Sequence, residues 1–295
     1  MQYHFRHIVL VIGAANVLWS QNPSKEIVGF EYGLMPNVGE TSVEKYTVNF
    51  NFDKRLNESQ TIGFGVSYNA YDFMFNTASI GLDASAYENI HDIRLRIHYK
   101  YAITASWSAN LMFSPTISSS LSESLSEEDL ILSSMATLSK SWGDKNKQAS
   151  LAFGVGYGPY FGKPQVIPVI LFRKKINARW SYILGVPRAM ISYHRDDRHK
   201  VSAEANINGF FGNVSSGVDF PELGSLQNTK LQYNSLDMAL KYKYRIQPNW
   251  TTVIKMGYSL WNQLKILDNG NNEIYDFGAS SSPFISMGLK YNLNK

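Results

Sequence analysis

The chain has 295 residues, with 28 Lys and Arg against 24 Asp and Glu, and it contains no cysteine. A net charge of +4 is too small to indicate nucleic acid binding, and the lack of cysteine excludes a disulfide framework. The length suits one large β-domain or two smaller ones.

The first twenty residues have the pattern of a secretory signal. Arg6 supplies the positive charge, residues 8–19 form an apolar stretch, and Ser20 is a small residue at a cleavage point before Gln21. We therefore predict a signal peptide over 1–20 and a mature chain over 21–295, the alternative being a buried N-terminal strand or helix. No later stretch approaches the roughly 18 apolar residues that a membrane helix needs.

The rest of the chain alternates between large apolar and polar or small residues. In the segment 88–101, Ile93, Leu95 and Ile97 alternate with charged residues, and this period of two places each set on one face of a strand. The pattern predicts about fourteen strands, near residues 26–34, 44–55, 60–74, 88–101, 105–118, 129–141, 148–158, 164–173, 178–186, 189–195, 200–211, 229–245, 249–262 and 283–294. Twelve strands is the alternative, because prolines interrupt 164–168 and the pair of short strands around Pro187.

A turn sequence recurs between these strands. It reads Tyr99-Lys100-Tyr101 followed by Trp107, and again Tyr242-Lys243-Tyr244 followed by Trp250. Short turns are predicted on one side, at 55–60, 102–105, 142–147, 174–178, 195–199 and 246–249. Long loops are predicted on the other side, at 75–87, 119–128, 212–228 and 263–282. An even number of strands would return both termini to the side of the short turns, as in bacterial barrels.

Alternation alone also fits a soluble secreted β-sandwich or adhesin. The predicted strands are commonly ten residues or longer, whereas strands of globular proteins average about five or six. Their apolar faces end in Tyr, Trp or Phe, as at membrane interfaces. These features favour an all-β transmembrane barrel of antiparallel, up-and-down strands.

The chain resembles an uncharacterised, domain-of-unknown-function family of outer-membrane β-barrels typical of Bacteroidota, which are Gram-negative bacteria. The resemblance rests on the Ser20-Gln21 junction, the Tyr-Lys/Arg turns, Gly185-Val186-Pro187 before the Tyr193 hairpin, and the last alternating strand over 285–293. It implies an outer-membrane location and a barrel fold, but no defined activity. The implied partners are outer-membrane lipid, lipopolysaccharide and the barrel-assembly machinery, which would have to read Tyr291 or accept an overhang because the chain ends on Lys295.

If the apolar faces meet lipid, the polar faces point into the lumen. Ten charged residues or histidines on these faces are candidates for setting solute selectivity: Asp92, Arg94, Arg96, His98, Lys100, Glu204, Asp237, Lys241, Lys243 and Lys255. Glu31, Lys45 and Lys290 are predicted to share the inner face. Cations are in excess, which predicts a porin-like passive channel for small polar or anionic solutes. The alternative is a purely structural barrel filled by charge pairs.

A membrane-embedded lipid-modifying hydrolase or acyltransferase would need a Ser–His–acid set. The segment 194–199 carries two histidines, but it lies in a short turn where charge is expected, so we predict no catalytic residue, metal or cofactor. The segment 268–273 fits a Gly/Asn turn better than a calcium loop. Acidic residues of the long loops could form a rim that binds divalent cations bridging lipopolysaccharide. Transport of hydrophobic compounds would need an apolar groove in the lumen.

Overall fold

The computed structural model describes residues 25–39, 41–76, 82–144 and 147–293, so the predicted signal peptide lies outside it. The strands are β1 Lys25–Met35, β2 Thr41–Arg55, β3 Gln60–Phe75, β4 Asn89–Ala102, β5 Trp107–Ser119, β6 Leu130–Trp142, β7 Ala149–Phe161, β8 Lys163–Lys175, β9 Trp180–Val186, β10 Arg188–His194, β11 His199–Val214, β12 Val218–Phe220, β13 Gly224–Leu226, β14 Thr229–Gln247, β15 Trp250–Leu267, β16 Glu273–Asp276 and β17 Ser282–Leu293. Two short 3₁₀ turns, η1 Ser85–Tyr87 and η2 Glu127–Asp129, lie in connections between strands.

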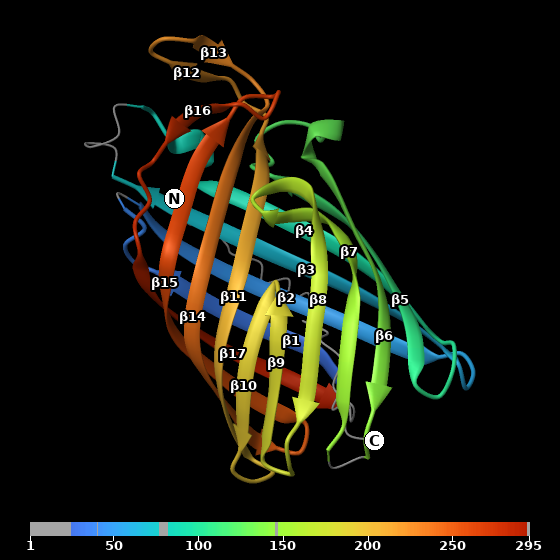
Figure 1. Ribbon diagram of the computed structural model, residues 1–295. Helices are drawn as coiled ribbons and strands as arrows, with labels where there is room; N and C mark the ends of the chain where they lie inside the picture. Colours follow the sequence, from blue (N-terminus) through green and yellow to red (C-terminus); the bar gives the residue numbers. More distant parts are fainter. Residues whose placement is uncertain (1–24, 40, 77–81, 145–146, 294–295) are drawn as a thin grey trace, which may run out of the picture.

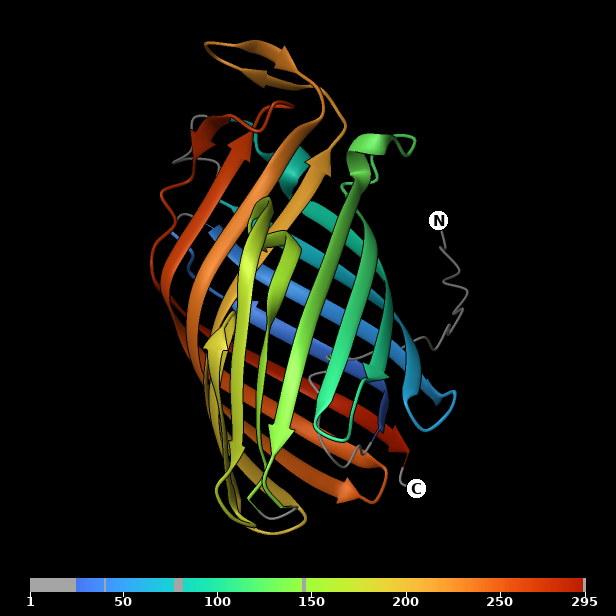
Figure 2. The ribbon, with the colours of Figure 1, turned by 45° about the vertical axis from the view of Figure 1, so that its right-hand side comes forward.

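Fourteen of these strands close into one antiparallel barrel (Figures 1 and 2). β1 to β11 follow one another around the wall, and β14, β15 and β17 complete it, with β17 pairing back to β1. The predicted count of fourteen is confirmed and the alternative of twelve is wrong. The short strands β9 and β10 are genuine wall strands, because β10 pairs with β9 at Tyr193–Trp180 and with β11 at Arg188–Asn206.

The two ends of the barrel differ, as the sequence predicts. The turn end carries the connections 56–59, 103–106, 143–148, 176–179, 195–198 and 248–249. The loop end carries the long connections 76–88, 120–129, 215–228 and 268–281, and the β12–β13 hairpin projects from it (Figure 1). The sorting by length is incomplete, because β7–β8 reverses at the loop end through the single residue Gly162, and β9–β10 reverses on the same side but lower in the wall through the single residue Pro187.

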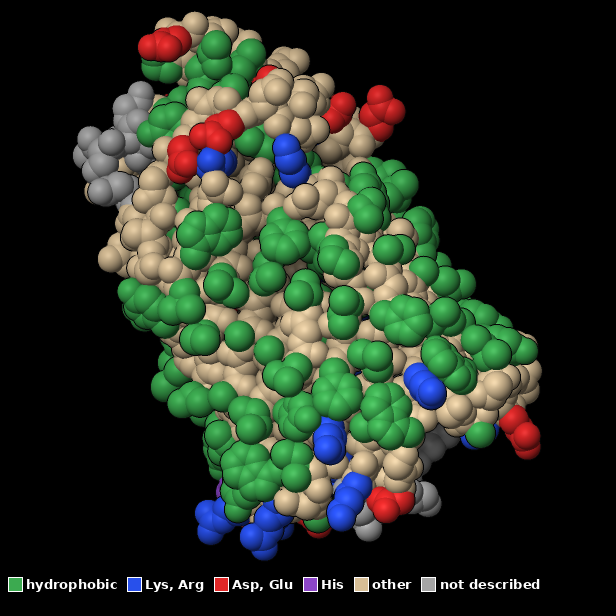
Figure 3. All heavy atoms as spheres, viewed as in Figure 1, with side chains coloured by type: hydrophobic (Ala, Val, Ile, Leu, Met, Phe, Trp, Pro, Cys, Tyr) green, Lys and Arg blue, Asp and Glu red, His purple; other side chains and the backbone are tan. Residues whose placement is uncertain are grey.

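The outer face carries a broad band of exposed apolar side chains, visible in Figure 3. On β2, for example, Phe50 and Phe52 are exposed while Asn49 and Asn51 are buried. So large an apolar surface is stable against hydrocarbon rather than water, and a closed barrel leaves few strand edges unpaired there. No described helix is long and apolar enough to span a bilayer.

Above the short β9–β10 hairpin, β11 leaves the wall and crosses the lumen. β10 pairs with β11 only as far as Asn206, but β11 continues along β14 to Val214. In this crossing segment, residues 207–214, Asn213 pairs with Ser119 of β5, and the Asn213 carbonyl accepts a hydrogen bond from the Ser120 N–H at 2.9 Å. Five wall strands lie between β5 and β11, so this contact spans the barrel interior.

Both faces of the crossing segment are covered by the inner wall. On one side Phe210 packs against Tyr71 and Phe73 of β3, with ring centroids 4.4 and 6.1 Å away. On the other side Phe211 packs with Ile131 and Leu267. A Cβ on Gly209 would lie 2.0 Å from the Pro159 carbonyl oxygen, so only glycine allows the β7–β8 tip to approach so closely.

Apolar side chains fill the loop end around the crossing segment. This loop-end core consists of Phe73, Phe75, Leu82, Ala84, Tyr87, Ile90, Phe210, Val214, Val218, Phe220, Leu231, Leu264, Ile266 and Phe277. Burial raises the pKa of the Tyr87 hydroxyl to about 12, and its oxygen lies 2.6 Å from the Thr229 hydroxyl. The loop end of the lumen is therefore closed by protein.

Candidate functional site: the basic lumen and its closure

Below the loop-end core, the inner wall carries charged side chains. All ten predicted lumen residues alternate with exposed apolar residues and so lie on the inner face of β4, β11, β14 or β15. On β4, Ile93 and Leu95 are exposed on the outside, while Asp92 is buried and Arg94 is about one-third exposed toward the lumen. Glu31, Lys45 and Lys290 also face inward, as predicted.

Some of these charges form pairs. Arg94 binds Asp92 at 3.0 Å, and Asp92 also accepts a hydrogen bond from Asn69 at 2.8 Å. His98 lies 3.2 Å from Asp53 of β2, across Gly63 of the intervening strand β3. On the opposite wall, Glu204 pairs with Lys241, and Asp237 accepts a hydrogen bond from Asn208 at 2.6 Å. The predicted residues thus form two separate groups, one on β4 and one on β11, β14 and β15.

The structure adds three inward cations that the sequence analysis missed: Arg173 of β8, Arg188 of β10 and Lys200 of β11. Arg188 binds Glu204 at 2.7 Å. Arg173 could have been found, since it continues the inner face of Val169 and Leu171 by strict alternation. Lys200 likewise alternates with the exposed Val201.

Like charges lie directly opposite each other on adjacent strands. Lys200 is the register partner of Lys243, and Lys241 is the register partner of Lys255. Such pairs are unfavourable across antiparallel strands, and a network built only to hold the strands in register would place opposite charges there. The arrangement leaves an excess of positive charge on the wall formed by β8, β10, β11, β14 and β15.

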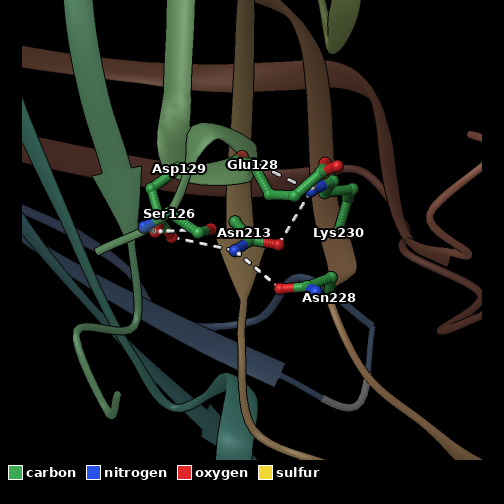
Figure 4. Close-up of polar contacts among 6 residues, drawn as sticks. All are labelled: Ser126, Glu128, Asp129, Asn213, Asn228 and Lys230. Carbon is green, nitrogen blue, oxygen red and sulfur yellow. Dashed lines mark hydrogen bonds and ion pairs between the residues drawn. The ribbon is translucent and has the colours of Figure 1, made fainter. Parts of the chain in front are cut away.

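A polar network closes the loop end above the lumen (Figure 4). This loop-end network consists of Ser126, Glu128, Asp129, Asn213, Asn228 and Lys230. Lys230 Nζ donates to Glu128 Oε2 and to Asn213 Oδ1, both at 2.8 Å, and Asn213 Nδ2 donates to Asp129 Oδ1 at 2.8 Å. Asn213 therefore bridges a buried ammonium and a buried carboxylate from segments that are distant in the chain.

The Asp129 carboxylate is held by several donors. Its Oδ2 accepts the Ser126 backbone N–H at 2.7 Å and the Ser126 hydroxyl at 3.1 Å. Burial alone would raise the pKa of Asp129, but hydrogen bonds from Ser119, Asn213 and Ser126 hold it below its ordinary value. Asp129 is consequently ionised in the closed loop end.

In the turn around 194–199, the side chain of Asp196 binds the backbone of the turn itself. Asp196 Oδ1 accepts the N–H groups of Arg198 and His199, each at 2.8 Å, and His199 Nδ1 lies 2.6 Å from the Tyr242 hydroxyl. Asp268 similarly accepts the Asn272 N–H at 2.8 Å, as expected for a turn. Among the described residues, no cluster of three His, Cys, Asp or Glu could hold a metal ion.

Some acidic residues of the loop end form ion pairs with lysines of the same end. Lys265 lies 2.5 Å from Glu273 and 3.2 Å from Asp276, and Lys230 forms an ion pair with Glu128. In the view of Figure 3, acidic side chains gather at the loop end and basic ones at the turn end. The inner apolar patch of Ala152, Val169 and Leu171 is buried, so it is a small core rather than a groove.

A protein-family model matches residues 35–292. The chain belongs to the DUF6268 family. This family is described only as a domain of unknown function, which confirms the kind of family that the sequence resembles, while a restriction to Bacteroidota stays a prediction. A search of curated proteins finds no match.

Solved outer-membrane barrels are similar to this DUF6268 chain in overall form. An outer-membrane channel from Pseudomonas putida F1 is 10% identical with a TM-score of 0.44, over 90% of this chain and 93% of that one. The NanC porin is 9% identical with a TM-score of 0.40, over 90% of this chain and 100% of that one. Outer membrane phospholipase A from Escherichia coli is 10% identical with a TM-score of 0.38, over 93% and 94%. Both channels and an enzyme are thus among the similar structures.

Proposed function

We propose that the protein is a passive, porin-like channel of the outer membrane that favours small anionic solutes and is closed at its loop end by the crossing segment. The apolar outer band and the predicted signal peptide support the location. The closure supports a channel that conducts only after the crossing segment has moved.

The observation that carries this proposal is the pairing of like charges on the inner wall. Lys241 and Lys255 face each other across β14 and β15, and Lys200 faces Lys243 across β11 and β14. A solute anion between such cations offsets their repulsion, so anions are concentrated in the lumen relative to cations.

The test is single-channel recording of the refolded mature protein in planar bilayers under a salt gradient. We expect discrete steps and a reversal potential of the sign that anion preference gives. Replacing both Arg94 and Arg96 by Glu should shift the reversal potential toward cations, whereas replacing the outward, exposed Lys140 and Lys174 by Glu should leave it nearly unchanged. Each variant must first show the heat-modifiable migration of a folded barrel.

Two outcomes contradict the proposal. One is a reversal potential that is the same in the wild type and in the Arg94/Arg96 variant. The other is a folded, inserted protein that stays silent even when the loop-end network has been weakened by substitution.

A further inference from the structure

The Nε atom of an arginine near the turn end of the lumen has no hydrogen-bond partner among the described residues. The Nε atoms of Arg173 and Arg188 are both buried without one, and the positive charge of Arg188 lies close enough to Arg173 to act on it. Arginine is charged at every physiological pH and has five N–H donors. Buried N–H donors without an acceptor are rare in folded proteins, so the two Nε atoms need an explanation.

Further cations surround this arginine. Lys200, Lys241 and Lys243 lie close enough to interact electrostatically with Arg188 or with Glu204. We call Arg173, Arg188, Lys200, Lys241 and Lys243 the Arg173 cluster. Its members come from β8, β10, β11 and β14, and they are held in place by the wall itself.

Among the described residues, one carboxylate forms all the ion pairs of the cluster. The same oxygen, Glu204 Oε2, accepts hydrogen bonds from both Arg188 and Lys241. Within the described part of the chain, no carboxylate lies within ion-pair distance of Arg173, Lys200 or Lys243, and Lys200 and Lys243 are register partners. The five cations of the cluster therefore carry more positive charge than the one carboxylate of Glu204 neutralises.

The cluster lies toward the turn end. Arg173 is close to the end of β8, and Lys200 and Lys243 flank the turn 195–198. Since the loop end is closed, a solute would reach the cluster from the turn end.

We propose that the Arg173 cluster binds a small oxyanion with at least two negative charges, of the phosphate or dicarboxylate type. Arginine forks match pairs of phosphate or carboxylate oxygens, and lysines add charge without a fixed geometry. This site rests on the proposed function in that it names the class of solute, although binding itself does not require conduction.

The probe is inorganic phosphate, titrated by calorimetry into the folded barrel in a phosphorus-free detergent at constant ionic strength. We expect saturable binding to the wild type, and binding weaker by about tenfold or more in Arg173→Gln, because hydrogen bonds to a charged group are lost. The matched control is Lys174→Gln, the next residue of β8, which is exposed on the outer side. Succinate should compete with phosphate, and chloride should not.

Thermal unfolding supplies a second readout. Arg173→Gln should unfold at a higher temperature than the wild type without phosphate, since it removes repulsion, and should lose the stabilisation that phosphate gives the wild type. A residue with only a packing role would instead lower the unfolding temperature in both conditions.

The outcomes separate this inference from the proposed function. Anion-selective conductance with no phosphate binding overturns the site and leaves the channel. Phosphate binding by a barrel that never conducts overturns the channel and leaves the site. Equal phosphate affinity in Arg173→Gln and Lys174→Gln overturns the assignment to Arg173.

Discussion

Asn213 of β11 pairs in parallel with Ser119 of β5, although five wall strands separate β5 from β11. Both residues are almost completely buried. A parallel contact inside an otherwise antiparallel barrel arises because β11 turns inward above Asn206 and meets the opposite wall. The state of the lumen therefore depends on what holds Asn213 in place.

Asn213→Ala should weaken the closure. The change leaves Lys230 and Asp129 each short of a buried hydrogen bond, a loss on the order of 3 kcal/mol. We expect the fraction of time spent in a conducting state to rise at least about tenfold. Single-channel recording measures it.

The matched control is Asn249→Ala at the turn end, where the Asn249 amide donates to the Tyr291 hydroxyl at 3.3 Å. This variant should conduct like the wild type. Equal open fractions in the two variants would show that the loop-end network does not hold the gate.

Acid should open the same closure. The pKa of Asp129 lies below its ordinary value of 3.8 in the closed loop end, where hydrogen bonds from Ser119, Asn213 and Ser126 outweigh the effect of burial. If opening exposes this carboxyl to water, its pKa returns toward that value. Ionised Asp129 thus stabilises the closed form above pH 3.8, and this contribution is lost as the pH falls through the lowered pKa. Conductance should increase over that range.

Asp129→Asn separates this effect from general acid damage. The variant cannot ionise, so it should conduct more than the wild type at neutral pH and should lack the Asp129 contribution on acidification. An identical pH response in the wild type and the variant would contradict a role for Asp129.

The barrel was predictable because its pattern is local. Alternation places Ile93 and Asp92 on opposite faces whatever the rest of the chain does, and the turn sequence ending in Trp107 or Trp250 recurs at one end. The closure was not predictable in this way. Asn213, Lys230 and Asp129 meet only because β11 crosses the lumen, which depends on contacts between distant segments.

One signal of the crossing was nevertheless present. Phe210 and Phe211 are adjacent large apolar residues, and in a wall strand one of them would face the lumen. Such a pair is typical of a strand that is buried on both faces. The predicted strand ended at 211, whereas β11 continues to Val214 because β14 pairs with it as far as Thr229.

Prolines protect the edge of β8 that faces the gap above the β9–β10 hairpin. β9 pairs with β8 only from Ile170 onward. The Lys175 N–H donates to the Gln148 carbonyl on the β7 side at 2.8 Å, so the odd-numbered residues of β8 direct their backbone groups to β7. Because alternate residues of a strand point their backbone groups to opposite sides, residues 164, 166 and 168 direct theirs to the open edge. Pro164 and Pro168 have no N–H, which leaves fewer unpaired donors next to the exposed Val166.

Pro168→Ala should therefore destabilise the barrel by about 1–3 kcal/mol, because it adds an unpaired N–H at the apolar edge. Pro115→Ala is the matched control with the opposite sign. Pro115 of β5 lies within the wall where the β4–β5 register skips from Arg94–Thr116 to Ile97–Phe113, so an added N–H there can complete the ladder. Urea unfolding in lipid vesicles compares the two, and equal changes would refute the protective role.

Phe210 should contribute far more stability than an outward phenylalanine. Phe210→Ala removes a ring buried between Tyr71, Phe73 and the rest of the loop-end core, and such truncations cost about 3–5 kcal/mol. Phe64→Ala removes a ring of similar size that is 43% exposed on the outer face, where lipid can replace part of its contacts. Urea unfolding in vesicles should show a clearly larger loss for Phe210→Ala, and single-channel recording should show a higher open fraction for that variant alone. If Phe210→Ala is destabilised but remains closed, the polar contacts of Asn213 rather than the apolar core keep the crossing segment in the lumen.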